Sequence, residues 1–122
     1  MEYIFICYAG VNRSPVAVDV ARTLAGKYGI KDFKTEFLGI ANVDYLNLDS
    51  FRKRLNQANI IFALDNEIVD ELVRKGISLR KVCNLEIEDC YPVREHPKLR
   101  GELERILTFK LEPFFKQHRE SL

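Results

Sequence analysis

Residues 3–15 read YIFICYAGVNRSP, and this stretch decides the fold of the chain. The apolar, β-rich run predicts a buried strand over Glu2 to Ile6. After Pro15 the apolar residues recur every four positions, as they do on one face of a helix. Ser14 can cap this helix, Pro15 suits its first turn, and Gly29 predicts its end. The stretch therefore predicts a buried strand, a short glycine-bearing loop and a helix in immediate succession.

The rest of the chain alternates between strand-like and helix-like segments. Further strands are predicted over Phe33 to Gly39, Ile60 to Leu64 and Lys81 to Ile87, and further helices over Leu48 to Ala58, Glu67 to Lys75 and from Leu99 onward. This alternation predicts the α/β class: a single three-layer domain over residues 1–122, in which helices cover both faces of a four-stranded parallel sheet.

Local signals predict how the later helices begin and end. Asp49 or Ser50 is expected near the cap of the second helix, and Asp65 is expected to cap the third. Pro113 should break or kink the last helix, which leaves the phenylalanines at 114–115 to pack as a short extra turn.

Composition restricts the partners. Hydrophobic residues make up 47% of 122 residues, which is enough for a core, and a net charge of +1 gives no indication of nucleic-acid binding. The start, MEYIFICYAG, is too short in apolar residues for a signal peptide or a membrane span. The three cysteines predict a cytoplasmic protein with reduced thiols, and we expect a monomer without membrane contact. His96 and His118 have no partner at metal-ligand spacing, so no metal is expected.

Three side chains of chemical interest come at or just after predicted strand ends. Because ligands bind beyond the carboxyl ends of parallel strands, we expect Cys7, Asp65 and Asp89 on one rim of the molecule. We expect Asp65 to act there mainly as a helix cap.

The first loop has the composition of an anion site. Backbone N–H groups that point inward, with a helix N-terminus behind them, bind a tetrahedral dianion, and Gly10 allows the tight turn. Arg13 supplies a planar fork for two oxygens, and the sulfur of Cys7 would lie beneath the phosphorus. Ser14 can donate to that sulfur, and we expect this role to prevail over helix capping. The alternative is a buried cysteine and a surface arginine without chemistry.

A thiolate beneath a phosphate ester predicts nucleophilic displacement at phosphorus, which needs an acid for the leaving oxygen. Asp89, in LEIEDCYP, is the candidate, because its neighbour Glu88 should point to the other side. Asp89 would then activate the water that cleaves the phosphocysteine.

The stretch CYAGVNRSPVA after YIFI resembles the phosphate-binding loop of low-molecular-weight protein tyrosine phosphatases. Two later stretches, LDSFRKRLNQANIIFALDNEIVDEL and LEIEDCYP, are similar to the same family in the same order, the second to its Asp-Pro-Tyr loop. The resemblance implies a flavodoxin-like fold and hydrolysis of phosphotyrosine, in a protein or a small aryl phosphate. It also implies inhibition by phosphate-like oxyanions and no cofactor.

The resemblance assigns roles to individual residues. It implies Cys7 as nucleophile, Arg13 as phosphate clamp, Ser14 as thiolate partner, Asp89 as general acid and Tyr91 as a wall of the cleft. The implied phosphate loop comprises Cys7, Tyr8, Ala9, Gly10, Val11, Asn12, Arg13 and Ser14.

Several positions depart from the family pattern. Gly10 replaces an asparagine that braces the loop, so the brace must come from elsewhere or the loop is softer. Asn12 stands where the family often has a second cysteine, and Cys90 replaces the proline after the acid. The segment IANVDYLNLDS is shorter than in the family. Tyr8 or Tyr45 could replace a lost cleft wall, or either could be an ordinary exposed or core tyrosine.

The cysteines leave other functions open. Cys7, Cys83 and Cys90 could form the relay of an arsenate reductase of the same fold, although Cys83 is expected to point into the core. Cys90 could instead form a reversible disulfide that protects Cys7 from over-oxidation, or have no redox role. A catalytically weak phosphate- or phosphoprotein-binding module is a further alternative, and a phosphotransfer domain is disfavoured by Arg13.

Overall fold

The computed structural model describes residues 1–88, 90, 92–93 and 95–120, with only the backbone described at position 120. Its centre is a parallel sheet in the order β2-β1-β3-β4. The strands are β1 (Glu2–Cys7), β2 (Lys34–Gly39), β3 (Ile60–Ala63) and β4 (Val82–Asn84). This is the predicted four-stranded parallel sheet.

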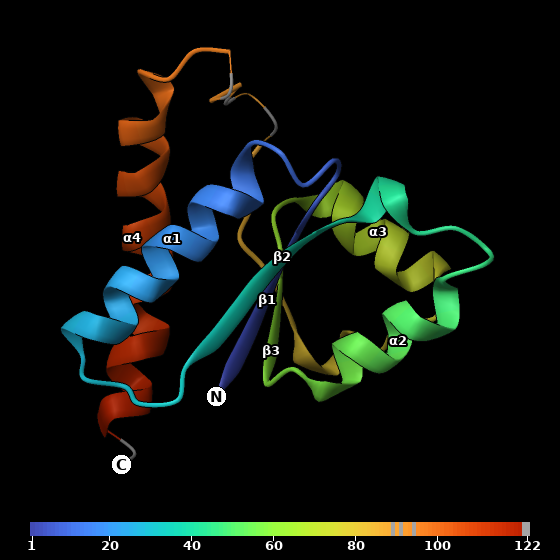
Figure 1. Cartoon of the computed structure of the whole chain (residues 1–122), viewed down its shortest axis with the longest axis horizontal. Helices are drawn as coiled ribbons and strands as arrows, with labels where there is room; N and C mark the ends of the chain where they lie inside the picture. The colour runs from blue at the N-terminus through green and yellow to red at the C-terminus, as the bar shows by residue number, and fades with distance from the viewer. Residues whose placement is uncertain (89, 91, 94, 121–122) are drawn as a thin grey trace.

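The helices form a layer on each face of the sheet, as predicted (Figure 1). The helices α1 (Arg13–Lys27) and α4 (Leu99–Glu120) pack on one face, where Tyr3 and Phe5 of β1 point. The helices α2 (Leu48–Gln57) and α3 (Asn66–Arg74) cover the other face, which receives Ile4 and Ile6. Helices cover β1 on both faces, which explains why its sequence is a continuous apolar run. The predicted three-layer α/β arrangement is confirmed.

At the start of α1, Ser14 contacts the Cys7 sulfur and does not cap the helix, as expected. The helix α1 begins at Arg13, and Ser14 lies inside it with its hydroxyl 2.9 Å from the Cys7 sulfur. The helix α2 begins at Leu48, as predicted, with Asp49 in its first turn. Asn47 occupies the cap position, and its side chain accepts from the N–H of residue 44. Short polar side chains near both helix starts thus bond to other groups.

The last strand is shorter than predicted. It ends at Asn84, whereas the prediction extended it to Ile87, because Glu86 adopts a left-handed conformation with φ +55°. Two short 3₁₀ helices, Ile40–Asn42 and Leu79–Lys81, complete the connections.

The predicted break at Pro113 is also wrong, because α4 continues through it to Glu120. The buried side chains of this helix lie four residues apart on both sides of the proline: Leu103, Leu107, Leu111 and Phe115. The carbonyl that lacks the proline's N–H belongs to Phe109, whose side chain is 82% exposed, so water can reach this part of the helix. Burial of the apolar face therefore holds the helix together across Pro113.

Candidate active site

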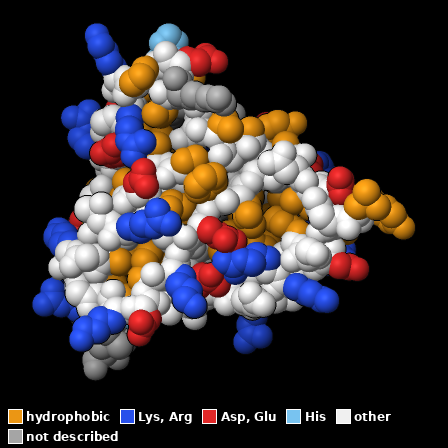
Figure 2. Space-filling view, viewed as in Figure 1, with side chains coloured by type: hydrophobic (Ala, Val, Ile, Leu, Met, Phe, Trp, Pro, Cys, Tyr) orange, Lys and Arg blue, Asp and Glu red, His pale blue; other side chains and the backbone are white. Residues whose placement is uncertain are grey.

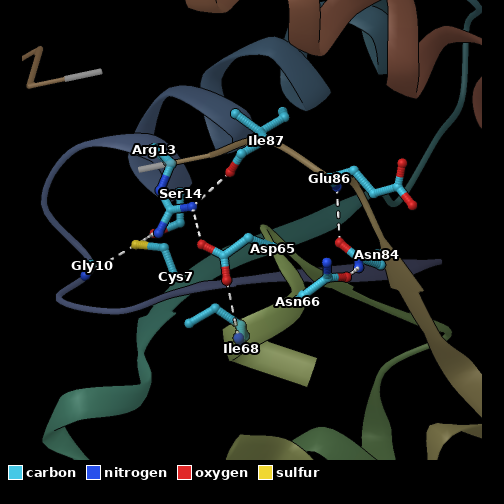
Figure 3. Close-up of polar contacts among 10 residues, drawn as sticks. All are labelled: Cys7, Gly10, Arg13, Ser14, Asp65, Asn66, Ile68, Asn84, Glu86 and Ile87. Carbon is cyan, nitrogen blue, oxygen red and sulfur yellow. Dashed lines mark hydrogen bonds and ion pairs between the residues drawn. The ribbon is translucent and has the colours of Figure 1, made fainter. Parts of the chain in front are cut away.

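The carboxyl ends of β1 and β3 bring Cys7 and Asp65 to one rim, as predicted, together with the chain that follows β4 (Figure 3). The loop 8–12 connects Cys7 to α1 and lies over this end of the sheet. The third residue predicted for this rim, Asp89, lies outside the described residues, as does Tyr91.

The Cys7 sulfur is almost fully buried and lies close to two polar groups. It accepts the N–H of Gly10 at 3.1 Å and lies 2.9 Å from the hydroxyl of Ser14, a side chain with no exposed surface. Gly10 has φ +75°, which turns its N–H toward the sulfur at little cost for a residue without Cβ. When the sulfur is ionised, both groups can donate a hydrogen bond to it.

The main chain at the end of β2 and directly after it braces the loop. The N–H of Ala41 donates to the carbonyl of Tyr8 at 2.8 Å. A Cβ at Gly39 would lie 2.6 Å from the carbonyl oxygen of Ala9, so only glycine allows this close packing. The brace that Gly10 cannot supply by a side chain thus comes from the backbone of another strand.

Arg13 is 2% exposed and connects the loop to two other elements. Its Nη1 donates to Oδ2 of Asp65 at 2.5 Å and to the carbonyl of Ile87 at 2.7 Å. The other carboxylate oxygen of Asp65 accepts the N–H of Ile68 at 3.0 Å, which caps α3 as predicted. The sequence predicted that Asp65 caps α3 but not that it pairs with Arg13. The only signal for this ion pair was the expected position of Cys7 and Asp65 on the same rim.

A small hollow at the loop is lined by Cys7, Tyr8, Ala9, Val11, Asn12 and Arg13. Tyr8 and Val11 expose 59% and 46% of their surface at its rim. Tyr45, predicted as a possible cleft wall, is 91% exposed after the 3₁₀ helix Ile40–Asn42 and does not line this hollow. Six residues of the predicted phosphate loop thus line one hollow, and Tyr8 is among them.

A larger hollow of about 420 Å³ lies beside the loop and shares Ala9 and Gly10 with it. Its apolar wall includes Phe37 and Phe51, and its polar groups include Asn42 and Ser50. Figure 2 shows apolar side chains within a hollow on this face, with Lys, Arg, Asp and Glu side chains interspersed around it. The loop is therefore flanked by an open, mostly apolar surface.

Cys7, Cys83 and Cys90 are all free thiols in the structure. Cys83 lies on β4 and packs against the core beneath α1 and α4, and burial raises the pKa of its thiol. A raised pKa disfavours the thiolate that a relay would require. Cys90 is exposed.

Among the described residues, no three His, Cys, Asp or Glu side chains are grouped closely enough to hold a metal ion. Nor does any helix in the described part of the chain have the length and apolar character needed to cross a membrane.

No protein family model matches the sequence, and no curated protein matches it significantly. Solved structures do resemble it. A low-molecular-weight protein tyrosine phosphatase from Bacillus subtilis superposes with a TM-score of 0.72 at 17% identity, over 98% of this chain and 99% of the other. A low-molecular-weight phosphotyrosine phosphatase from Vibrio cholerae gives a TM-score of 0.78 at 12% identity, over 99% and 98%.

A third similar structure is the arginine phosphatase YwlE of Bacillus subtilis, solved as a variant with a phosphorylated active-site serine. It superposes with a TM-score of 0.64 at 15% identity, over 98% of this chain and 99% of the other. The chain thus has the fold of the low-molecular-weight protein tyrosine phosphatases along nearly its whole length.

Proposed function

We propose that the chain is a cysteine-dependent phosphomonoesterase of the low-molecular-weight protein tyrosine phosphatase family, which acts through a phosphocysteine. The observation that carries this proposal is the Cys7 sulfur, held between the Gly10 N–H and the Ser14 hydroxyl at the end of β1. A buried arginine follows in the same loop, and the overall fold is that of known phosphatases.

In the first step the Cys7 thiolate attacks phosphorus, and the bond from phosphorus to the leaving oxygen breaks. Arg13 is anchored through Nη1, which donates to Asp65 and to the carbonyl of Ile87. Its guanidinium and the loop N–H groups would hold the equatorial oxygens. Asp89 would donate its proton to the leaving oxygen.

In the second step water attacks the phosphocysteine. Asp89, now a carboxylate, takes a proton from this water, and the bond between sulfur and phosphorus breaks to release inorganic phosphate. The sulfur leaves as a thiolate, which the Gly10 and Ser14 donors are placed to stabilise. The cycle then returns to its starting state.

The substrate that we propose is phosphotyrosine, in a protein or as a small aryl phosphate. The exposed Tyr8 and Val11 give the loop an apolar rim that suits an aromatic ring. Phosphoarginine is the second candidate, because Tyr8 also borders a hollow lined by Glu67 and Asp70, whose carboxylates suit a guanidinium.

The other functions predict different behaviour. A binding module would hold phosphate without turnover. An arsenate reductase would need Cys83 and Cys90, and the half-buried position of Cys83 on β4 argues against it. Arsenate reduction that is lost in Cys83→Ser or Cys90→Ser would support the relay, and phosphatase activity that survives both changes would argue for the proposed function.

The test is hydrolysis of p-nitrophenyl phosphate, phosphotyrosine and phosphoarginine by the wild type and by Cys7→Ser. We expect turnover that Cys7→Ser abolishes, and a phosphoryl adduct on Cys7 in acid-quenched wild-type protein by mass spectrometry. Cys90→Ser is the matched control and should leave turnover intact. Phosphate binding without hydrolysis would favour the binding module, and preference for phosphoarginine would replace the tyrosine assignment.

A further inference from the structure

The chain after β4 keeps contact with the sheet although the strand has ended. The N–H of Leu85 donates to the carbonyl of Ala63 at 2.8 Å, and that of Ile87 to the carbonyl of Leu64 at 2.7 Å. The side chains of Leu85 and Ile87 are both 3% exposed. Both residues are therefore fixed against the core.

Glu86, between them, is exposed and adopts φ +55°, which residues with a Cβ rarely adopt. Its N–H donates to Oδ1 of Asn84 at 2.8 Å, a local bond that supports such a turn. Nδ2 of Asn84 donates to Oδ1 of Asn66 at 2.6 Å, at the start of α3. The Asn84–Asn66 amide pair thus ties the turn at Glu86 to α3.

This turn sets the direction in which the chain enters the site (Figure 3). The carbonyl of Ile87, directly after Glu86, accepts from Nη1 of Arg13 at 2.7 Å. Only Glu88 separates Ile87 from Asp89 in the sequence. The same short segment therefore anchors the guanidinium and leads to the proposed acid.

We propose that Asn84 is a positioning residue for phosphoryl transfer, which stabilises the left-handed turn at Glu86 and thereby directs the segment that carries Asp89. Asn66 supports it by holding the side-chain amide of Asn84 in place. The inference rests on the proposed function, in which Asp89 protonates the leaving group.

A merely structural role for Asn84 would have a different consequence. If the hydrogen bonds of the Asn84 side chain stabilise only the fold, their loss would lower the melting temperature and reduce the activity toward all substrates alike. A displaced acid affects poor leaving groups more than good ones, because only poor leaving groups depend strongly on protonation. The ratio of kcat/KM for p-nitrophenyl phosphate to kcat/KM for phenyl phosphate therefore separates the two roles.

In Asn84→Ala we expect this ratio to rise about five- to tenfold, as part of the general-acid contribution is lost. Adding Glu86→Gly should return the ratio to the wild-type value, because glycine adopts a positive φ without help from a side chain. Glu86→Gly alone should leave the ratio unchanged. The matched control is Asn59→Ala: the Asn59 side chain accepts a backbone N–H at 2.7 Å at the opposite end of the sheet, and its loss should not change the ratio.

The outcomes separate this inference from the proposed function. A raised ratio in Asp89→Asn but an unchanged ratio in Asn84→Ala would overturn the positioning role alone. A raised ratio in Asn84→Ala that Glu86→Gly does not restore would overturn the turn as its cause. An unchanged ratio in Asp89→Asn would overturn the acid assignment, and the positioning role with it.

Discussion

The loop after β1 and the segment after β4 both leave the sheet at its carboxyl end and both reach Arg13, but they are held differently. The loop is braced by main-chain contacts: the Ala41 N–H on Tyr8, and the Gly39 backbone against Ala9. The segment after β4 is also bound to β3 by main-chain hydrogen bonds, but its turn at Glu86 is guided by two side chains at the surface, those of Asn84 and Asn66.

This difference predicts different tolerance to substitution. Contacts between backbones leave no room for a larger residue, so changes there displace the loop itself. Exposed side-chain hydrogen bonds are individually weak, and their loss shifts a segment without disrupting the fold. We therefore expect abrupt losses of activity from changes at the loop and graded losses from changes after β4.

The largest effect should come from Arg13→Lys, because this residue joins the two regions. Lysine keeps a charge but lacks the planar fork, so kcat/KM for p-nitrophenyl phosphate should fall about 10²- to 10³-fold. Arg100→Lys is the control, because Arg100 pairs with Asp19 and Glu104 on the surface. If the Arg13→Lys variant is as active as the wild type, the positive charge alone, and not the planar guanidinium, connects the loop with the segment after β4.

Gly39→Ala should have the next largest effect. Its Cβ would lie 2.6 Å from the Ala9 carbonyl, so the loop must move, and we expect about a tenfold loss of kcat/KM with a destabilisation of about 1–3 kcal/mol. Steady-state kinetics and denaturant unfolding measure the two. Gly26→Ala, in α1 with open space around it, is the matched control and should be neutral or slightly stabilising. If Gly39→Ala and Gly26→Ala have the same activity and stability, the close packing of Gly39 on Ala9 does not brace the loop.

The parts of this site that the sequence predicted are those set by local signals. The run YIFI, the glycine in the loop and the cap at Asp65 each act within a few residues, so their positions follow from short patterns. The rim position of Cys7 and Asp65 then follows from the parallel sheet.

The parts that the sequence did not predict depend on contacts between distant segments. The bond from Arg13 to Asp65 joins residues 52 positions apart, and the packing of Gly39 on Ala9 shows no sign in either local pattern. At Pro113 the local signal predicted a break in the helix, but the packing of α4 on α1 keeps the helix continuous. Asp89 and Tyr91 stay predictions from the sequence.

A smaller effect is expected from Lys110→Met, which tests the segment after β4 from its other side. The Lys110 ammonium donates to the carbonyl of Leu85 at 2.5 Å, one residue after Asn84. Removing this bond should destabilise the protein by about 0.5–1.5 kcal/mol, since methionine retains most of the apolar stem. Denaturant unfolding measures this loss. A loss of activity as large as that of Gly39→Ala would contradict the graded tolerance expected of this segment.

The smallest effect should come from Glu2→Gln, at the far end of the sheet from both regions. The hydrogen bond from Arg54 holds the pKa of Glu2 below its ordinary value, so the ionised form stabilises the fold at neutral pH. We expect Glu2→Gln to lower the free energy of unfolding by about 0.5–1 kcal/mol at pH 7, with unchanged kcat/KM. Denaturant unfolding from pH 7 to pH 3 measures this difference.

The sign of the pH dependence follows from the lowered pKa of Glu2. Its contribution is complete above the ordinary glutamate pKa and is lost as the pH falls through the lowered value, so wild type and Glu2→Gln should converge once the pH is below that lowered value. A gap that persists at acid pH would mean that the contact acts through packing and not through charge. A change in kcat/KM would mean that the start of β1 is coupled to the loop at its other end. The loop could then not be compared with the segment after β4 without taking β1 into account.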